Sequence, residues 1–533
     1  MKNFLAFAVT TVYRLMSLYP ADRMVKPFRS VMLARVDDKN YPSVSGTIAV
    51  QVVEAPFYYG LLGVIAAEIS RQSGYSSDAV VIRATSGAIG MGWTAWIRRS
   101  MLINWLMTSQ WVRSLHPVIV RVGLRCESWA HPINDSIDAW RSRKIWQHVR
   151  QQEDDLQLTI DGVQVGDLVI DSYLRFRPSP KFDVDDPFVL QLIRQAHRSV
   201  RRARRYFSSY KPKLYLTSYS TYIEHGVPVR VALQEGVRVY SFGSLNLFGK
   251  RLSIADSYHT VNCERYAEIF ASLSQHDRRR TEAETQLCIR LSGGVDPATS
   301  YMKTSAYAGG EASIPKGLDG AVVIFLHDFY DSPHGYPDLL FSDFWQWAVF
   351  TIDILDKAGI KYFLKPHPNQ IALSVSALED FLKIYSSARI LLSTLTNTQL
   401  AKAGIACGVT AYGTVAHELA YLGVPTIACA RHPHTAFDFC RTAKNLGEYA
   451  ELISAADTMS IDREYMRRQA LEFYYMHNLY GSPEDLELRQ HFIGLWRECQ
   501  HPRSDIISAQ SKLAALRDSP AFASRISQML KDS

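Results

Sequence analysis

Short apolar runs, each followed by a polar loop or a helical pattern, recur along most of this chain. In the first half such runs cover residues 46–53, 79–84, 213–218 and 239–242, and a helical pattern follows the first run at 59–71. Short buried strands that alternate with helices are typical of a parallel sheet. A β-hairpin is also expected, turning at Asp161 and Gly162.

The second half restarts the same rhythm after a connector rich in Gly, Ser and Ala. Apolar runs occur at 321–326, 361–364, 389–392, 406–411 and 426–430, with helical patterns at 343–358, 374–385 and 415–422. We therefore predict an α/β fold with two Rossmann-like domains and a cleft between them. The predicted segments are an amphipathic helix and lead-in at 1–40, a first domain at 41–305, a linker at 306–320, a second domain at 321–480 and a helical tail at 481–533.

The composition describes a folded protein with a modest positive charge. Of its 533 residues, 47% are hydrophobic and 21% are charged, and Lys and Arg exceed Asp and Glu by 59 to 52. A net charge of +7 is too small for a dedicated nucleic-acid binder, although it suits an anionic surface or substrate. The seven cysteines contain no CxxC pair, so we expect buried free thiols in a reducing compartment rather than zinc or disulfides.

No run of about 18 apolar residues could span a membrane, but the first twenty residues form an amphipathic pattern. Asn3, Thr10, Arg14 and Ser17 share one side of the predicted helix, and apolar side chains cover most of the rest. A docked helix, an interfacial membrane helix and a signal peptide remain open. We expect a cytoplasmic location, with contact to the inner face of the cytoplasmic membrane as an open question.

Three further segments allow two or more interpretations. The glycines at 87, 90 and 92 do not have the GxGxxG spacing, so a phosphate loop, a flexible acceptor-side loop and a plain turn all remain open. Asp183 to Asp186 could be a metal-binding DxD, but Pro187 and an apolar helical run follow, which favours a helix cap. That helix carries a row of basic residues that is either a solvated face or a surface for lipid head groups or an anionic acceptor: Arg194, His197, Arg198, Arg201, Arg202, Arg204 and Arg205.

Polar side chains follow successive strands of the predicted second sheet, where α/β proteins bind their ligands. A Gly-Thr turn at the start of a helix lets a phosphate or ribose approach exposed backbone N–H groups. A carboxylate in the first helical turn can also simply complement the helix dipole. We predict a nucleotide-binding site built from His327, Asp328, Lys365, His367, Tyr412, Gly413, Thr414, His417 and Glu418.

The order HD, then KPHPN, then YGTVAHELAYLGVPTIA resembles GT-B glycosyltransferases of bacterial capsule and surface-polysaccharide assembly. The chain is similar to capsule Kdo transferases and, more distantly, to teichoic-acid glycerophosphate polymerases. Residues 162–175 and 218–242 resemble the same proteins, so the likeness covers about 155–440. It implies a GT-B-like α/β fold, with two Rossmann-like domains facing across a cleft and helical insertions and a tail. The first domain would bind the acceptor, and the second would bind the nucleotide-sugar donor.

The resemblance also implies roles for the donor-site residues. His367 would lie by the donor phosphate, and Gly413, Thr414 and Glu418 would hold phosphate and ribose. Lys365, Tyr412 and His417 are assigned to the same site only from their positions after the predicted strands. The resemblance implies transfer without a bound metal and without a cofactor beyond the nucleotide-sugar substrate.

The general base is less well defined by the sequence. An inverting transfer needs a carboxylate or His of the first domain near the acceptor hydroxyl. Asp171 is our preferred candidate because Tyr173 and Arg175 lie near it in the sequence, and the alternatives are Glu54, Glu224 and His225. His327 and Asp328 could instead contact the donor sugar or the acceptor.

These inferences lead to one main hypothesis and two alternatives. The main hypothesis is a glycosyltransferase that moves a sugar from a nucleotide-activated donor, with a CMP-sugar favoured, to a growing surface polysaccharide or glycolipid. Its partners would be the nucleotide-sugar, the glycan or glycolipid acceptor and the membrane surface, but no nucleic acid. The alternatives are a non-hydrolysing UDP-sugar 2-epimerase and a catalytically inactive GT-B-fold scaffold for polysaccharide assembly.

Overall fold

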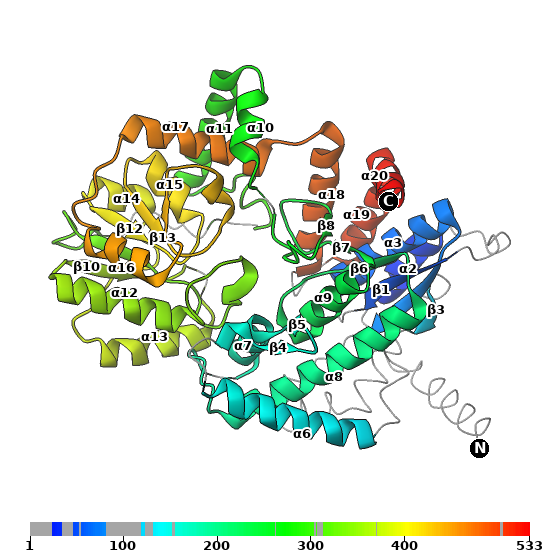
Figure 1. Ribbon diagram of the computed structural model, residues 1–533. Coiled ribbons are helices and arrows are strands. Elements are labelled where there is room, and N and C mark those ends of the chain that lie inside the picture. Colours follow the sequence, from blue (N-terminus) through cyan, green and yellow to red (C-terminus); the bar gives the residue numbers. More distant parts are fainter. Residues whose placement is uncertain are drawn as a thin grey trace. The chain divides into compact units, whose positions relative to one another are not determined.

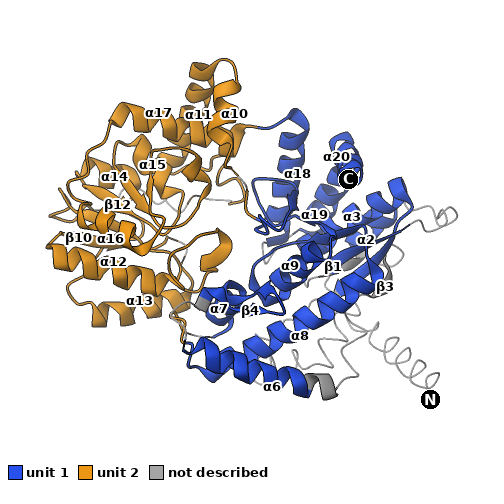
Figure 2. Ribbon diagram, in the orientation of Figure 1, with its two compact units in different colours: residues 1–177, 184–259, 481–533 blue, residues 178–183, 260–480 orange. Residues whose placement is uncertain are grey.

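The computed structural model describes residues 24–34, 46–52, 55–81, 119–122, 132–151, 155–177, 179–261, 263–302, 305, 313–368, 370–500 and 505–532. The predicted helix at 1–20, Glu54 and the Gly-rich segment at 87–92 lie outside these residues. The chain forms two compact units (Figure 2). Unit 1 comprises Met1–Arg177, Val184–His259 and Gly481–Ser533, and unit 2 comprises Pro178–Asp183 and Thr260–Tyr480.

Unit 1 is built on a six-stranded sheet whose strand order is β3-β2-β1-β6-β7-β8. All neighbouring strands are parallel except β8, which runs antiparallel to β7. Counted along the sheet this is the doubly wound order 3-2-1-4-5-6, as in Rossmann folds. The strands are β1 (Thr47–Val52), β2 (Ser76–Val81), β3 (Ile119–Val122), β6 (Leu214–Thr217), β7 (Arg238–Ser241) and β8 (Lys250–Leu252).

Two helices of unit 1 match predicted ones, namely the helix predicted at 59–71 and the helix predicted after Asp186. The hairpin of β4 (Thr159–Ile160) and β5 (Val163–Gln164) turns at Asp161 and Gly162, both with positive φ. Asp186 caps the helix that begins at Pro187 by accepting a hydrogen bond from the Phe188 backbone N–H, which confirms the predicted helix cap. The helices are α2 (Val25–Leu33), α3 (Pro56–Ser73), α6 (Pro132–Val149), α7 (Gly166–Phe176), α8 (Pro187–Tyr210) and, after a π-helical turn at Tyr222–Gly226, α9 (Val227–Gln234).

The C-terminal helices are part of unit 1 rather than a separate tail. They are α18 (Pro483–Gln500), α19 (Ile506–Asp518) and α20 (Pro520–Lys531). Phe492 and Phe522 are almost fully buried in the same apolar core as Phe57, and the Phe57 and Phe492 rings lie 4.9 Å apart. The prediction of an appended tail at 481–533 is therefore wrong, because these helices complete the core beside α3.

Unit 2 repeats the doubly wound arrangement. Its six strands have the order β11-β10-β9-β12-β13-β14, and every neighbouring pair is parallel. Because both faces of these strands are covered, β9, β10, β12 and β13 are buried along their whole length. The strands are β9 (Val322–Phe325), β10 (Tyr362–Lys365), β11 (Arg389–Ile390), β12 (Cys407–Val409), β13 (Thr426–Ala428) and β14 (Arg441–Thr442).

Helices cover both faces of this sheet (Figure 1). α12 (Phe344–Ala358), α13 (Ala372–Ile384) and α16 (Leu446–Ser454) pack on one face. α14 (Asn397–Lys402) and α15 (Val415–Tyr421) pack on the other. Two further helices, α11 (His276–Leu291) and α17 (Arg463–Tyr474), lie behind α15, and α10 (Tyr266–Ser272) packs on α17.

The two units divide at residues 259 and 260, which differs from the predicted linker at 306–320. Phe270, Ala283 and Leu287 of α10 and α11 share an apolar core with Phe473 and Tyr474 of α17. This packing joins residues 260–302 to unit 2. The predicted boundary lies later because it is based only on the small residues at 304–320. The prediction of an α/β fold with two Rossmann-like domains is confirmed by the two sheets.

The remaining differences concern edges and surfaces. β3 and α6 lie in the segment at 118–150, for which the sequence analysis gave no strand or helix. Cys407, Cys429 and Cys440 are buried free thiols, as expected, but Cys288 is exposed. Within the described residues, no helix combines the length and the apolar character needed to cross a membrane.

Candidate functional site

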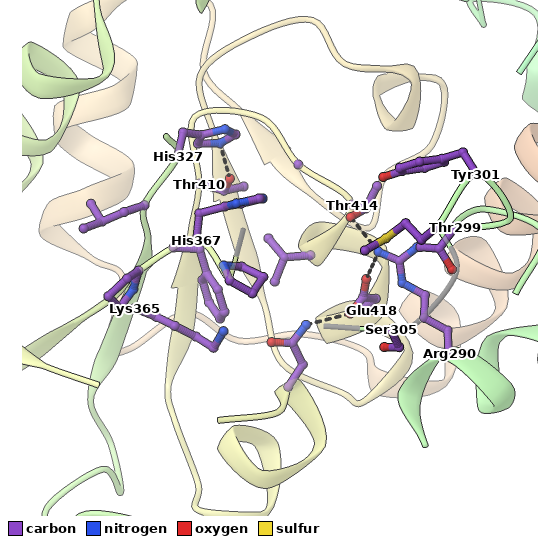
Figure 3. Close-up of a pocket in the computed structure, with 18 of the residues that line it drawn as sticks. Arg290, Thr299, Tyr301, Ser305, His327, Lys365, His367, Thr410, Thr414 and Glu418 are labelled. Atoms are coloured by element: carbon purple, nitrogen blue, oxygen red, sulfur yellow. Dashed lines mark hydrogen bonds and ion pairs between the residues drawn. The ribbon is translucent and has the colours of Figure 1, made fainter. Parts of the chain in front are cut away.

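A pocket of about 230 Å³ lies at the carboxyl ends of β9, β10 and β12 in unit 2 (Figure 3). This is the edge of a doubly wound sheet where ligands commonly bind. Its polar lining comes from the ends of these strands and the loops after them, from α11 and the segment that follows it, and from the starts of α14 and α15. The polar and charged residues that line it are Arg290, Thr299, Tyr301, Ser305, His327, Lys365, His367, Asn397, Thr410, Thr414 and Glu418.

His327, which follows β9, forms one wall of the pocket. Its Nε2 lies 3.2 Å from the Thr410 hydroxyl, and its ring stacks on Phe344 with the centroids 4.6 Å apart. Burial, reinforced by the nearby charge of His367, lowers the pKa of His327 to about 3. The imidazole is therefore neutral at pH 7 and acts as a hydrogen-bonding group rather than a cation.

Lys365, the last residue of β10, and His367, two residues later, lie on the same side of the pocket (Figure 3). The Lys365 side chain is 2% exposed, and its ammonium donates to the Ser393 carbonyl at 3.2 Å. Burial lowers its pKa to about 8, with Glu418 opposing the shift, so the amine is mostly protonated at pH 7. Burial also lowers the pKa of His367. The pocket thus holds a desolvated ammonium beside a neutral imidazole, a combination suited to an anionic ligand.

The opposite wall is a charged network centred on Arg290 of α11. The guanidinium Nη2 lies 2.7 Å from Glu418 Oε1 and donates to the Thr414 hydroxyl at 2.9 Å. The second carboxylate oxygen of Glu418 accepts from the Asn397 amide at 2.6 Å. Asp296 lies 3.9 Å from the guanidinium on its far side. Both carboxylate oxygens of Glu418 already interact, one with Arg290 and one with Asn397. A ribose hydroxyl that bound Glu418 would have to displace one of these groups or bind beside it.

The turn before α15 brings backbone close to the pocket. Gly413 lines it, and a Cβ at this position would stand only 3.1 Å from the Thr410 hydroxyl, crowding the group that contacts His327. Thr414 precedes the first residue of α15, and its hydroxyl faces Arg290. A glycine here therefore keeps the floor of the pocket open.

Six of the ten predicted site residues line this pocket: Lys365, His367, Gly413, Thr414, Glu418 and His327. Asp328 does not. Its carboxylate accepts hydrogen bonds from the Ile371 and Tyr330 backbone N–H groups, both at 3.0 Å, and from the Ser374 hydroxyl. It therefore fastens the start of α13.

Tyr412 and His417 also lie outside the lining. The Tyr412 hydroxyl donates to the Ser332 carbonyl at 3.1 Å, and its ring packs on His327 from behind. His417 is buried against Phe473, with the ring centroids 5.3 Å apart. Adjacent positions of an α-helix point about 100° apart, so His417 cannot share the direction of Glu418. Burial places the pKa of His417 well below its ordinary range, with the charge of Arg290 adding to the shift.

The candidates for a general base belong to unit 1. Asp171 is 1% exposed within α7. Glu224 and His225 lie in the π-helical turn after β6, where Tyr222 has a positive φ of 61°. His225 Nδ1 lies 2.9 Å from the Gln51 amide, and burial lowers its pKa to about 4. The choice among these residues stays a prediction.

Sequence reasoning missed Arg290, Asn397 and Thr410. Arg290 is one of several basic residues in a charged helix, and only the packing of α11 behind α15 brings it to Glu418. Thr410 follows β12 by one residue, so its position at a strand end was a usable signal. Among the described residues, no group of three or more His, Cys, Asp or Glu side chains is arranged to hold a metal ion.

The chain matches no protein-family model and no curated protein. Among solved structures it is similar to a glycosyltransferase from Rickettsia africae, with 10% identity, 86% of this chain and 99% of that chain covered, and a TM-score of 0.28. It is also similar to a UDP-GlcNAc 2-epimerase from Methanocaldococcus jannaschii, with 9% identity, 78% and 93% covered, and a TM-score of 0.24. Likenesses this low say nothing of activity, and the fold assignment rests on the two sheets described above.

Proposed function

We propose that this protein is a glycosyltransferase that binds a nucleotide-activated sugar in the unit 2 pocket and transfers the sugar to a bacterial surface polysaccharide or glycolipid. The observation that carries the proposal is the convergence of Lys365, His367, Thr414 and Arg290 on one pocket at the carboxyl edge of a doubly wound sheet. Cations and hydroxyl donors aimed at one point stabilise a phosphate that gains negative charge as the sugar leaves.

A CMP-sugar is the favoured donor. The charged groups of the described lining are Arg290, Lys365 and Glu418, with the imidazoles neutral at pH 7. The lining therefore carries one net positive charge when Lys365 is protonated. One positive charge matches the single phosphodiester of a CMP-sugar better than the diphosphate of a UDP- or GDP-sugar, which carries two negative charges.

In the proposed reaction the acceptor hydroxyl attacks the anomeric carbon as the bond from that carbon to the phosphate oxygen breaks. The nucleotide leaves with the electron pair, and Lys365 and His367 would hold the phosphate at that moment. The acceptor proton would pass to a base of unit 1, with Asp171 as the preferred candidate. Transfer would proceed without a bound metal ion.

A thermal-shift panel tests the proposal. A nucleotide that binds only the native state at one hundred times its Kd adds about 2.7 kcal/mol of stability. We expect CMP to raise the melting temperature more than UDP or GDP, and Lys365→Met to remove the shift. Lys361→Met is the matched control, because Lys361 precedes the same strand at its opposite end and bonds the Asp319 carbonyl.

Product analysis separates the proposal from its alternatives. A transferase releases CMP from a CMP-sugar in step with acceptor elongation. Formation of a 2-epimer from UDP-GlcNAc without any acceptor would identify an epimerase instead. Stable folding with no saturable binding of CMP, UDP or GDP would identify a scaffold and refute the transferase.

The role of Glu418 has its own test. If its carboxylate holds the ribose, Glu418→Gln should weaken nucleotide binding in a calorimetric titration while cytosine base alone binds as before. Equal nucleotide affinity in the two proteins would reject a ribose contact.

A further inference from the structure

Helix α6 of unit 1 buries two polar side chains and exposes two large apolar ones. Its inner side presents Asp138 and Ser142, which are 2% and 0% exposed. Asp138 pairs with Arg201 of α8 at 2.7 Å and faces His197 at 3.2 Å. Trp140 and Ile137, in contrast, are 57% and 43% exposed. A helix that only separated the core from water would show the reverse arrangement.

The exposed residues form one continuous stripe. Positions three, four and seven apart lie on the same side of a helix. Residues Ile137, Trp140, Arg141, Lys144 and His148 have this spacing and are all exposed, and we call them the α6 stripe. The Lys144 ammonium lies 4.0 Å from the centre of the Trp140 ring, so a cation and an indole share one location. The stripe contains no acidic residue.

The charge of the surrounding surface is concentrated. α6 lies alongside α8 (Figure 1), and the two helices contain nine Lys and Arg but only two Asp. This excess equals the +7 of the whole chain, so the remainder is neutral overall. Of the two carboxylates, Asp138 is already paired with Arg201. The α6 stripe therefore lies in the most positive part of the chain.

We propose that the α6 stripe is a docking surface for an anionic phospholipid bilayer. The head groups would meet Arg141 and Lys144, while the Trp140 indole and the Ile137 side chain would enter the boundary between head groups and acyl chains. Trp is suited to this depth because its ring is apolar and its N–H is polar, and a Lys stem can lie along apolar surface with its charge in water. A soluble polyanion would satisfy the charges but leave Trp140 and Ile137 in water. The proposal does not depend on the pocket in unit 2.

Vesicle co-sedimentation of the full chain tests the docking surface. The probes are phosphatidylcholine vesicles with and without phosphatidylglycerol, and we expect the chain to bind only the anionic vesicles and to be released by salt. Arg141→Gln with Lys144→Gln should weaken this binding about thirty-fold, since each basic residue at an anionic surface contributes about five-fold. Arg265→Gln with Lys383→Gln is the matched control, because it removes two exposed charges from unit 2, and its binding should stay close to wild type.

Trp140 gives a second, independent readout. Brominated phospholipid should quench part of the tryptophan fluorescence of the wild type, and Trp140→Phe should lose that part. All variants keep residues 1–20, so a membrane contact made only by that segment would leave every variant bound as wild type. That result would overturn the proposal, as would equal weakening by the control pair.

Binding that dextran sulfate competes away, without any quenching of Trp140, would also overturn the proposal and would identify a surface for soluble polyanions. Nucleotide-induced stabilisation should be the same in all of these variants. Loss of vesicle binding and failure of the nucleotide site can therefore be told apart.

Discussion

The ion pair between Arg290 and Glu418 should hold one wall of the pocket, and a double-mutant cycle measures its strength. Glu418 and Arg290 have side chains only 5% and 15% exposed, and their atoms lie 2.7 Å apart. Removing one partner of a buried pair costs about 3–5 kcal/mol. Arg290 retains Thr414 and Asp296 when Glu418 is changed, so we expect about 2 kcal/mol for Glu418→Gln. Glu418 retains the Asn397 hydrogen bond and the electrostatic attraction of Lys365 when Arg290 is changed, but it loses its ion-pair partner at 2.7 Å, so we expect about 3 kcal/mol for Arg290→Gln.

The assay is urea unfolding of the wild type, the two single variants and the double variant. The double variant should lose only about 3 kcal/mol, because the second change removes a group that has already lost its partner. The coupling free energy would then be about 2 kcal/mol. The control cycle is Arg467→Gln with Glu284→Gln, a pair whose side chains are 49% and 37% exposed, and its coupling should stay below about 1 kcal/mol. Additive losses at Arg290 and Glu418, with coupling below about 0.5 kcal/mol, would refute the argument that this pair holds the wall.

Three other predictions concern ionisable groups of the chain. His367→Ala should lower turnover roughly tenfold or more at an unchanged melting temperature, and unchanged turnover would reject a phosphate contact. Nucleotide affinity should fall as the pH rises through about 8, because Lys365 loses its proton there. Lys365→Met should make the affinity nearly independent of pH in this range. A wild-type affinity that is constant from pH 7 to 9 would contradict the role of Lys365. Burial lowers the pKa of four histidines, His225, His259, His327 and His434, to about 3 or 4 in the folded protein, whereas in the unfolded chain they take up protons near pH 6.5. The stability that these groups contribute should therefore be complete above pH 6.5 and fall progressively toward pH 3. A urea midpoint that is equal at pH 7.5 and pH 5 would contradict this account.

The central strands of the second sheet could be predicted because each is a short, mostly apolar run that is buried along its length. β9, for example, reads Val-Val-Ile-Phe and is buried throughout. In the first sheet, β2 begins with Ser-Ser-Asp, three residues before the predicted run at 79–84. The edge strands β8, β11 and β14 have only two or three residues, and all three contain exposed positions. Such strands are defined by their hydrogen bonds to a strand that is distant in sequence, and the local sequence pattern does not predict these bonds.

Part of the site could be predicted because several of its residues lie at or after the ends of the predicted strands. Lys365 ends β10, His367 follows two residues later, and Thr414 lies at the start of the helix after β12. Parallel topology alone brings these positions to one edge of the sheet. Arg290 reaches the pocket through the packing of α11 on α17, a tertiary contact without a sequence signature. His417 was misplaced because a position beside Glu418 in sequence does not share its direction on a helix.

Hydrogen exchange measured with and without CMP tests the central claim most directly, because it locates the ligand on the chain. The account predicts slower exchange in peptides covering 362–368 and 410–418, with little change in the segments of unit 1. Saturating CMP that protects neither peptide, or that protects only segments outside 260–480, would contradict a nucleotide site at the carboxyl edge of the second sheet.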